Sequence, residues 1–142
     1  MTTNMLDALI RLRVPEALSQ AMALTVTPVY GTGPRDTDTC RVQPRGSLDR
    51  GTGATFALFL EQLLLAGYRK FILDFSEVPF VDSLGLATLL RLSRRARDEG
   101  GNLCLARLNA SVRRVTELTR IHQHLDVCDS VMEAQRELAS VA

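Results

Sequence analysis

The sequence predicts an α/β fold built on a mainly parallel sheet. Two short apolar runs, 70–75 and 102–107, have the composition of strands that are buried on both faces. Two stretches with the length and apolar spacing of helices, 53–66 and 83–98, precede and separate these runs. Because strands and helices alternate, we expect parallel strands with crossover helices packed on the sheet.

The composition narrows the classes of function. Of 142 residues, 46% are hydrophobic and 23% are charged, which is typical of one globular domain with a modest extension. The net charge is +1, Trp is absent and Tyr occurs twice, so direct binding of nucleic acid is not expected. The sequence has no apolar run of about 18 or more residues and no secretory signal pattern. We therefore expect a cytoplasmic protein without a membrane span.

The chain is predicted to have two parts. Residues 1–21 form an extension, in which apolar residues at helical spacing predict a helix over 4–13. This extension could dock on the main domain, or it could join two copies of the chain in a homodimer. The main domain is predicted to cover 22–142.

The first half of the main domain begins with alternating residues over 23–30, which predict a strand. Pro28 places this strand at an edge of the sheet, because proline cannot donate a hydrogen bond to a neighbouring strand. A turn over 31–36 leads to a second predicted strand over 38–45. Gly67 is expected to end the helix that covers 53–66.

The second half continues the alternation. Gly100-Gly101 is expected to end the helix over 83–98, and Asn109 is expected to cap a third helix. Residues 126–128 are predicted to form a short strand. Either Asp129 or Ser130 then caps the last helix.

The junction at Asp82-Ser83 is the best candidate for a functional site. A phosphate on Ser83 would lie at a helix N-terminus, where unpaired N–H groups and the helix dipole favour negative charge. It would add nearly two negative charges beside Asp82, and a partner burying this surface would then meet an unpaired charge. On spacing alone, Ser83 could instead be only the N-cap of the helix.

Several motifs around this junction resemble the STAS domain of bacterial anti-sigma factor antagonists. Asp82-Ser83-Leu84-Gly85 resembles the family's Asp-Ser-x-Gly phosphorylation site, and Leu73-Asp74 resembles the end of its central strand. Gly46-Ser47-Leu48-Asp49 resembles the turn after its second strand. The resemblance covers about residues 22–140. It implies a STAS fold, with a mostly parallel four- to five-stranded sheet and helices packed mainly on one face.

The resemblance also implies a function, that of an anti-sigma factor antagonist. The unphosphorylated protein would bind an anti-sigma factor that is a serine kinase of GHKL type, and phosphorylation of Ser83 would release it. A phosphatase of PP2C type would reverse the modification. The alternative is a STAS subunit of another assembly, such as a transporter ATPase partner or a stressosome-like scaffold, without control by phosphorylation. The implied partner-binding residues are Asp49, Asp82, Ser83, Leu84 and Gly85.

Other groups of residues give weaker indications of function. His122, His124 and Cys128 could suggest metal ligation, but a surface loop explains them as well. The four arginines of the 83–98 helix are interpreted as a solvated face. Ser83 lacks the GxSxG context of a hydrolase, so neither an enzyme nor a cofactor is expected. The remaining cysteines are interpreted, together with Cys128, as free buried thiols: Cys40 and Cys104.

Overall fold

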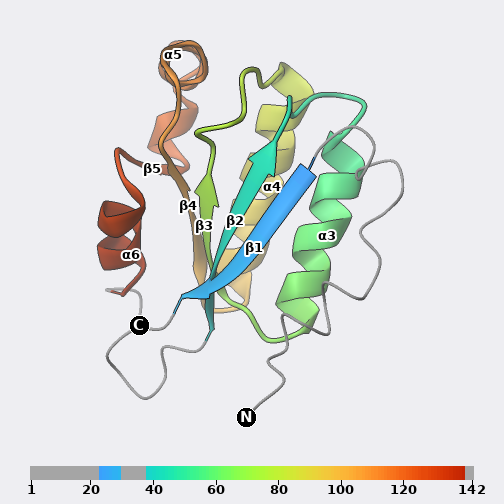
Figure 1. Ribbon diagram of the computed structural model, residues 1–142, viewed down its shortest axis with the longest axis vertical. Coiled ribbons are helices and arrows are strands. Elements are labelled where there is room, and N and C mark those ends of the chain that lie inside the picture. Colours follow the sequence, from blue (N-terminus) through green and yellow to red (C-terminus); the bar gives the residue numbers. More distant parts are fainter. Residues whose placement is uncertain (1–22, 30–37, 140–142) are drawn as a thin grey trace.

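The computed structural model describes residues 23–29 and 38–139. The predictions for residues 1–21 and for the turn over 31–36 lie outside the described residues. Within them, five strands form one sheet in chain order, flanked by helices (Figure 1). The strands are β1 (Ala23–Val29), β2 (Thr39–Arg45), β3 (Lys70–Asp74), β4 (Asn102–Ala106) and β5 (Asp126–Cys128). The helices are α3 (Gly53–Leu65), α4 (Ser83–Asp98), α5 (Ala110–Leu118) and α6 (Val131–Ala139), with a 3-10 turn η1 (Ile121–Gln123).

The sheet is mostly parallel, as predicted. Strands β2 to β5 pair in parallel, and β1 pairs antiparallel to β2 at the edge. Pro28 therefore lies on an edge strand. Pro44 lies on β2 beyond Val42, the last residue that pairs with β3, so its missing N–H breaks no pairing with the centre of the sheet.

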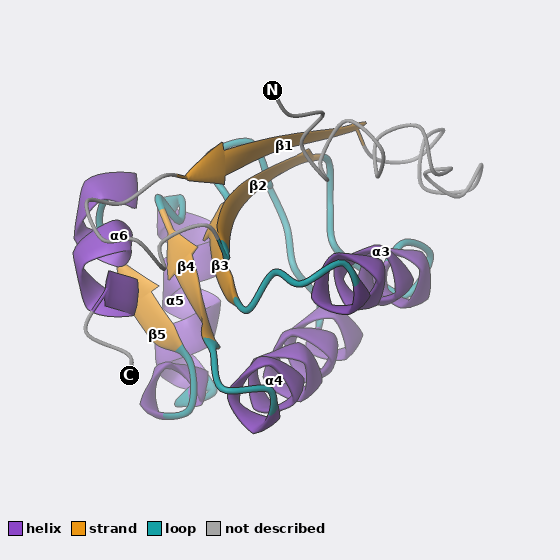
Figure 2. Cartoon of the chain, turned by 90° about the horizontal axis from the view of Figure 1, so that it is seen from below, coloured by secondary structure: helices purple, strands orange, loops and turns teal. Residues whose placement is uncertain are grey.

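The two faces of the sheet carry cores of different size. Figure 2 shows α3 and α4 on one side of the sheet and α6 on the other. The larger core joins α3, α4 and part of α5 to inward residues of the strands, with Phe56, Phe71 and Phe75 among its largest side chains. The smaller core lies under α6, around Ile72 and Leu138. Helices thus pack mainly on one face, as expected for a STAS fold.

The helix ends follow the predicted signals. Gly67 has φ 111° and its N–H donates to the Leu64 carbonyl, which ends α3. The side chain of Asn109 accepts from the Val112 N–H and caps α5. Ser130, rather than Asp129, caps α6, because its Oγ accepts from the Glu133 N–H at 3.0 Å. Among the described helices, none combines the length and apolar character that a membrane crossing requires.

Candidate functional site

The candidate site is built from two loops that run side by side at the carboxyl ends of the central strands. The first connects β2 to α3 over 46–52, and the second connects β3 to α4 over 75–82; we call them the paired loops. Leu48 and Val81 form a parallel bridge between them. The Leu48 N–H donates to the Phe80 carbonyl at 3.0 Å, and the Asp82 N–H donates to the Leu48 carbonyl at 3.2 Å. This strand-like pairing fixes the start of α4 against the start of α3.

Asp82 is the N-cap of α4 and also ties the paired loops together. One carboxylate oxygen, Oδ1, accepts from the Gly85 N–H at 2.8 Å. The other, Oδ2, accepts from the Arg50 N–H at 3.1 Å. Because Asp82 supplies the cap, the interpretation of Ser83 as the N-cap is wrong. Ser83 is instead the first residue of the helix.

The Ser83 side chain faces solvent. Its hydroxyl makes no hydrogen bond with any residue in the described part of the chain, so nothing there competes for its proton or lone pairs. Two large apolar side chains close to it in sequence are also exposed: Phe80 at 53% and Leu84 at 52%. An exposed hydroxyl close in sequence to exposed apolar side chains combines an accessible phosphate acceptor with a surface that favours a partner.

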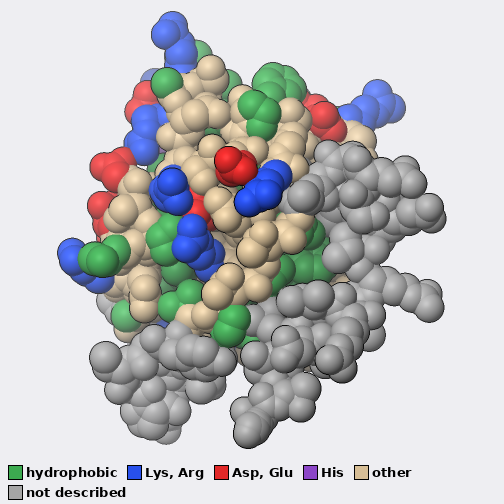
Figure 3. Space-filling view, viewed as in Figure 1, with side chains coloured by type: hydrophobic (Ala, Val, Ile, Leu, Met, Phe, Trp, Pro, Cys, Tyr) green, Lys and Arg blue, Asp and Glu red, His purple; other side chains and the backbone are tan. Residues whose placement is uncertain are grey.

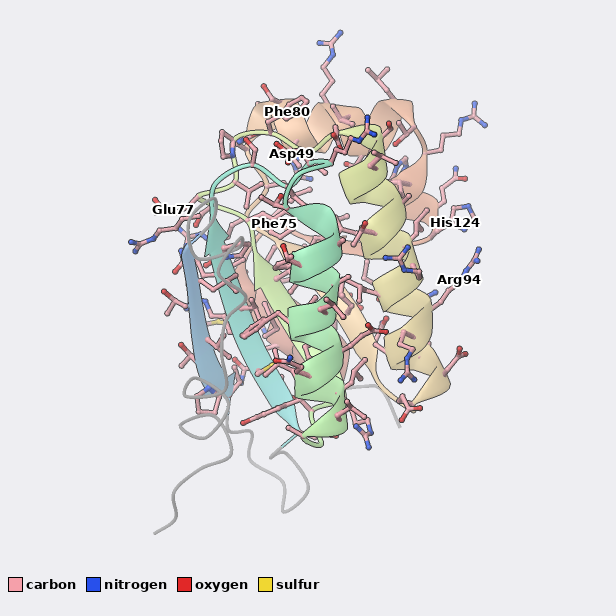
Figure 4. The ribbon with its side chains drawn as sticks, turned by 90° about the vertical axis from the view of Figure 1, so that its right-hand side faces the viewer. Asp49, Phe75, Glu77, Phe80, Arg94 and His124 are labelled. Carbon is pink, nitrogen blue, oxygen red and sulfur yellow. The ribbon has the colours of Figure 1, made fainter. Side chains whose placement is uncertain are left out.

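Asp49 lies on the first of the paired loops and holds the entry to α3. Its Oδ1 accepts from the Gly51 N–H at 2.9 Å, and its carbonyl accepts from the Gly53 N–H at 2.7 Å. Figure 4 shows Asp49 and Phe80 at the end of the molecule where α3 and α4 begin. The structure therefore brings Asp49 onto the same edge as the Asp82–Ser83 junction.

Gly85 differs from the other candidate residues because it is buried. A Cβ atom at this position would lie 2.5 Å from the Leu48 carbonyl oxygen and 3.0 Å from a Val81 methyl group. Glycine is needed there so that α4 can approach the backbone of the neighbouring loop. Gly85 consequently allows the close packing of α4 on the paired loops, but it is buried and offers no surface to a partner.

A charged cluster lies on the sheet face away from α3 and α4, and the sequence did not predict it. Asp74, at the end of β3, is fully buried and accepts from the guanidinium groups of Arg41 on β2 and Arg107 after β4. Burial raises the pKa of Asp74, but the Ser76 N–H, the Arg41 guanidinium, the Ser76 hydroxyl and the Arg107 charge outweigh it and hold that pKa below its ordinary value. Charged side chains gather at the centre of this face (Figure 3). The cluster anchors the strand that leads to the second of the paired loops.

The two histidines of the chain lie far from Ser83. The His124 carbonyl accepts from Arg97, near the C-terminal end of α4, and the His122 ring contacts the Thr116 carbonyl at 3.1 Å. Since α4 has 16 residues and is about 24 Å long, neither imidazole reaches the hydroxyl at its other end. In the described residues no cluster of His, Cys, Asp and Glu is arranged to hold a metal ion.

The geometry is that of a known family. Residues 34–134 match the STAS domain family, which covers well over half of the chain. The chain belongs to the STAS domain family, as the Asp-Ser-Leu-Gly junction and the order of the elements indicated.

Some relatives are named for a role within that family. A Thermotoga maritima protein named for a proposed role as an anti-sigma factor antagonist is 30% identical over 78 residues, which cover 55% of this chain and 69% of the relative. A crystal structure of a Thermotoga maritima protein with the same proposed role has a TM-score of 0.68 at 25% identity, covering 79% of this chain and 94% of that one.

The fold is also that of SpoIIAA, an anti-sigma factor antagonist. Its unphosphorylated form has a TM-score of 0.60 at 17% identity, covering 81% of this chain and 96% of that one. The phosphorylated form of the Bacillus protein has a TM-score of 0.57 at 16% identity, covering 81% and 99%. At these identities the likeness concerns the fold alone.

Proposed function

We propose that this protein is an anti-sigma factor antagonist whose binding to a cognate anti-sigma factor is controlled by phosphorylation of Ser83. The observation that carries the proposal is the placement of Ser83 as the exposed first residue of α4, with a hydroxyl that makes no hydrogen bond to the described residues. The relatives named for this role and the solved phosphorylated and unphosphorylated forms of SpoIIAA support it.

The local structure favours a phosphate on Ser83 within the protein itself. The first N–H groups of α4 point toward this end of the helix, and the helix dipole is positive there. Asp82 already uses the Gly85 N–H, but it is held by the paired loops and its position does not depend on the Ser83 side chain. Phosphorylation therefore changes the surface charge without requiring the domain to refold.

The same charge disfavours a bound partner. In this proposal the partner covers Phe80 and Leu84, which together offer the exposed apolar area beside the serine. A phosphate on Ser83 would then be buried directly after Asp82, on the same edge of the domain as Asp49 (Figure 4), and burying this added negative charge is costly. The free protein would bind a GHKL-type anti-sigma factor kinase, the phosphorylated protein would release it, and a PP2C-type phosphatase would restore binding. In this scheme Gly85 keeps the loop in place.

The first test is the intact mass of the protein purified from its own host, from resting and from stressed cells. We expect an addition of about 80 Da that phosphatase removes and that maps to Ser83. Ser111, an exposed serine in the first turn of α5, is the internal comparison and should carry no addition. If Ser83 is unmodified under both conditions, the phosphorylation switch is wrong and a constitutive assembly module becomes the better reading.

Binding provides the second part of the test. Tagged Ser83→Ala protein should retain a GHKL-type ATPase on purification from the host, and Ser83→Asp protein should lose it. Retention by both variants would contradict control at Ser83, even if the ATPase is an anti-sigma factor.

A further inference from the structure

Two of the three cysteines lie in contact inside the smaller core. Cys104 is on β4 and Cys128 ends β5, and their Sγ atoms are 3.0 Å apart. The β4–β5 register pairs Cys104 with Asp126 and Ala106 with Cys128, so both cysteines point to the α6 side of the sheet. The sulfur–sulfur distance is about 1 Å longer than a disulfide bond. Sequence spacing could not reveal this contact, because the two residues are separated by 24 positions.

The surroundings of the two thiols make them slow to react. Ile72, Ala134 and Leu138 pack around them under α6, and both cysteines are buried. Burial raises the pKa of both thiols, and the carboxylates of Asp126 and Glu137 add to this effect. Few thiolates therefore form at neutral pH, so reaction is slow and requires access through the edge of the sheet.

We propose that Cys104 and Cys128 form an oxidation site, in which a hydroperoxide joins the two side chains as a disulfide. Within the described residues, β5 is a three-residue edge strand whose one neighbour is β4, so local opening exposes Cys128 first. The Cys128 sulfur attacks one peroxide oxygen, the O–O bond breaks, and the products are a sulfenic acid and water or an alcohol. The Cys104 sulfur then attacks that sulfenic sulfur. The S–S bond forms, the S–O bond breaks, and the hydroxyl leaves as water with the Cys104 thiol proton.

The two steps are balanced and favour this pair. The two thiols lose two protons and two electrons in total, and the peroxide is reduced by the same two electrons. When β5 closes again, the Cys128 sulfur returns to its place against the Cys104 sulfur, which captures the sulfenic acid before a second peroxide can oxidise it further. The bond would join the edge strand to β4 and enclose α5 and η1 in a covalent loop.

Cys40 provides a matched control within the same chain. It lies on β2 and points into the larger core, on the opposite face of the sheet from the other two cysteines. It is equally buried, and burial raises its pKa as well. It differs in having no cysteine beside it among the described residues, so it should stay a thiol when the other two are oxidised.

The experiment uses the full-length reduced protein under native conditions. After treatment with hydrogen peroxide, the protein is denatured, alkylated with N-ethylmaleimide and weighed. We expect one alkylated cysteine, Cys40, and a mass loss of about 2 Da from the disulfide. Peptide mapping should find Cys104 linked to Cys128, and dithiothreitol should restore three alkylatable thiols. Amide exchange in β5 should slow several-fold after oxidation, because the new bond limits local opening.

Variants and denaturant separate the folded geometry from chance pairing. Cys40→Ala should behave like the parent chain, whereas Cys104→Ala and Cys128→Ala should form no intramolecular disulfide. In strong urea all three pairings should appear, since the contact is then lost. The proposal is overturned if the native protein gives a mixture of pairings, if it adds oxygen at these cysteines, or if three thiols persist after long exposure in urea just below the unfolding transition.

Discussion

Two helices of this domain begin in nearly the same way but present different surfaces. Asp82 caps α4 by accepting from the Gly85 N–H at 2.8 Å, and Asn109 caps α5 by accepting from the Val112 N–H at 2.8 Å. Each cap also holds a second segment: Asp82 binds the Arg50 N–H, and the Asn109 side-chain amide donates to the Val78 carbonyl. The first residue of α4 is Ser83, whereas α5 begins with an alanine.

The difference teaches that a good cap is not by itself a functional signal. Both caps stabilise a helix end, and both are explained by the unpaired N–H groups of the first turn. What distinguishes α4 is an exposed hydroxyl at its first position that makes no hydrogen bond to the described residues. It is close in sequence to exposed Phe80 and Leu84, on loops fixed by the Leu48–Val81 bridge. The start of α5 instead leads directly into a basic stretch with Arg113 and Arg114.

The largest loss of stability is expected from adding a side chain where α4 approaches the Leu48 backbone. Gly85→Ala places a Cβ 2.5 Å from the Leu48 carbonyl oxygen, and a backbone atom cannot move away as a side chain can. We expect the free energy of unfolding to fall by about 2 to 3 kcal/mol, as in an overpacked core. Urea denaturation followed by circular dichroism measures this change.

Gly53→Ala is the matched control for that substitution. Gly53 is also a buried glycine in the first turn of a helix, but a Cβ there would lie 3.4 Å from the Thr88 hydroxyl, an ordinary contact. Its stability should change by no more than about 0.5 kcal/mol. Equal losses in the two variants would show that the close approach of α4 to the first loop is not what requires glycine.

An intermediate effect is expected from removing the caps. Asp82→Ala and Asn109→Ala should each cost about 1 kcal/mol, and Asp82→Asn should cost much less because asparagine caps equally well. Amide exchange should tell the two sites apart. The Asp82→Ala variant should expose the Arg50 and Gly85 N–H groups, whereas Asn109→Ala should expose that of Val112. Unchanged exchange at Arg50 would mean that the bridge alone pairs the loops.

Much of the fold follows from local signals in the sequence. The apolar runs and helical periods give every described strand and α-helix, with ends displaced by one residue or so, because burial on both faces and helix capping leave local patterns. The 3-10 turn η1 was missed, since three residues carry too little pattern. Pro28 predicted the edge strand because proline excludes a central position.

The parts that could not be predicted depend on register between distant strands. The sequence marks Asp82, Ser83 and Gly85 as one motif, but it does not show that Gly85 lies under the Leu48 carbonyl or that Arg50 binds Asp82. The Asp74 cluster and the Cys104–Cys128 contact are similarly produced by neighbouring strands. The choice of Asp82 over Ser83 as the cap is a matter of one residue, which helix signals do not resolve.

The smallest change in stability is expected for serines in the first turns of α4 and α5. This prediction tests the comparison of the two helix starts most directly. Ser83→Ala removes an exposed hydroxyl without a partner in the described residues, so the free energy of unfolding should change by less than about 0.5 kcal/mol. Ser111→Ala, in the first turn of α5, should give the same small change. A loss near 1 kcal/mol for Ser83→Ala alone, measured by urea denaturation, would mean that Ser83 shares the capping of α4 with Asp82. Unchanged stability of Ser83→Ala would instead mean that the Ser83 hydroxyl does not stabilise the fold. Any defect of this variant in partner release would then be attributable to the missing phosphate.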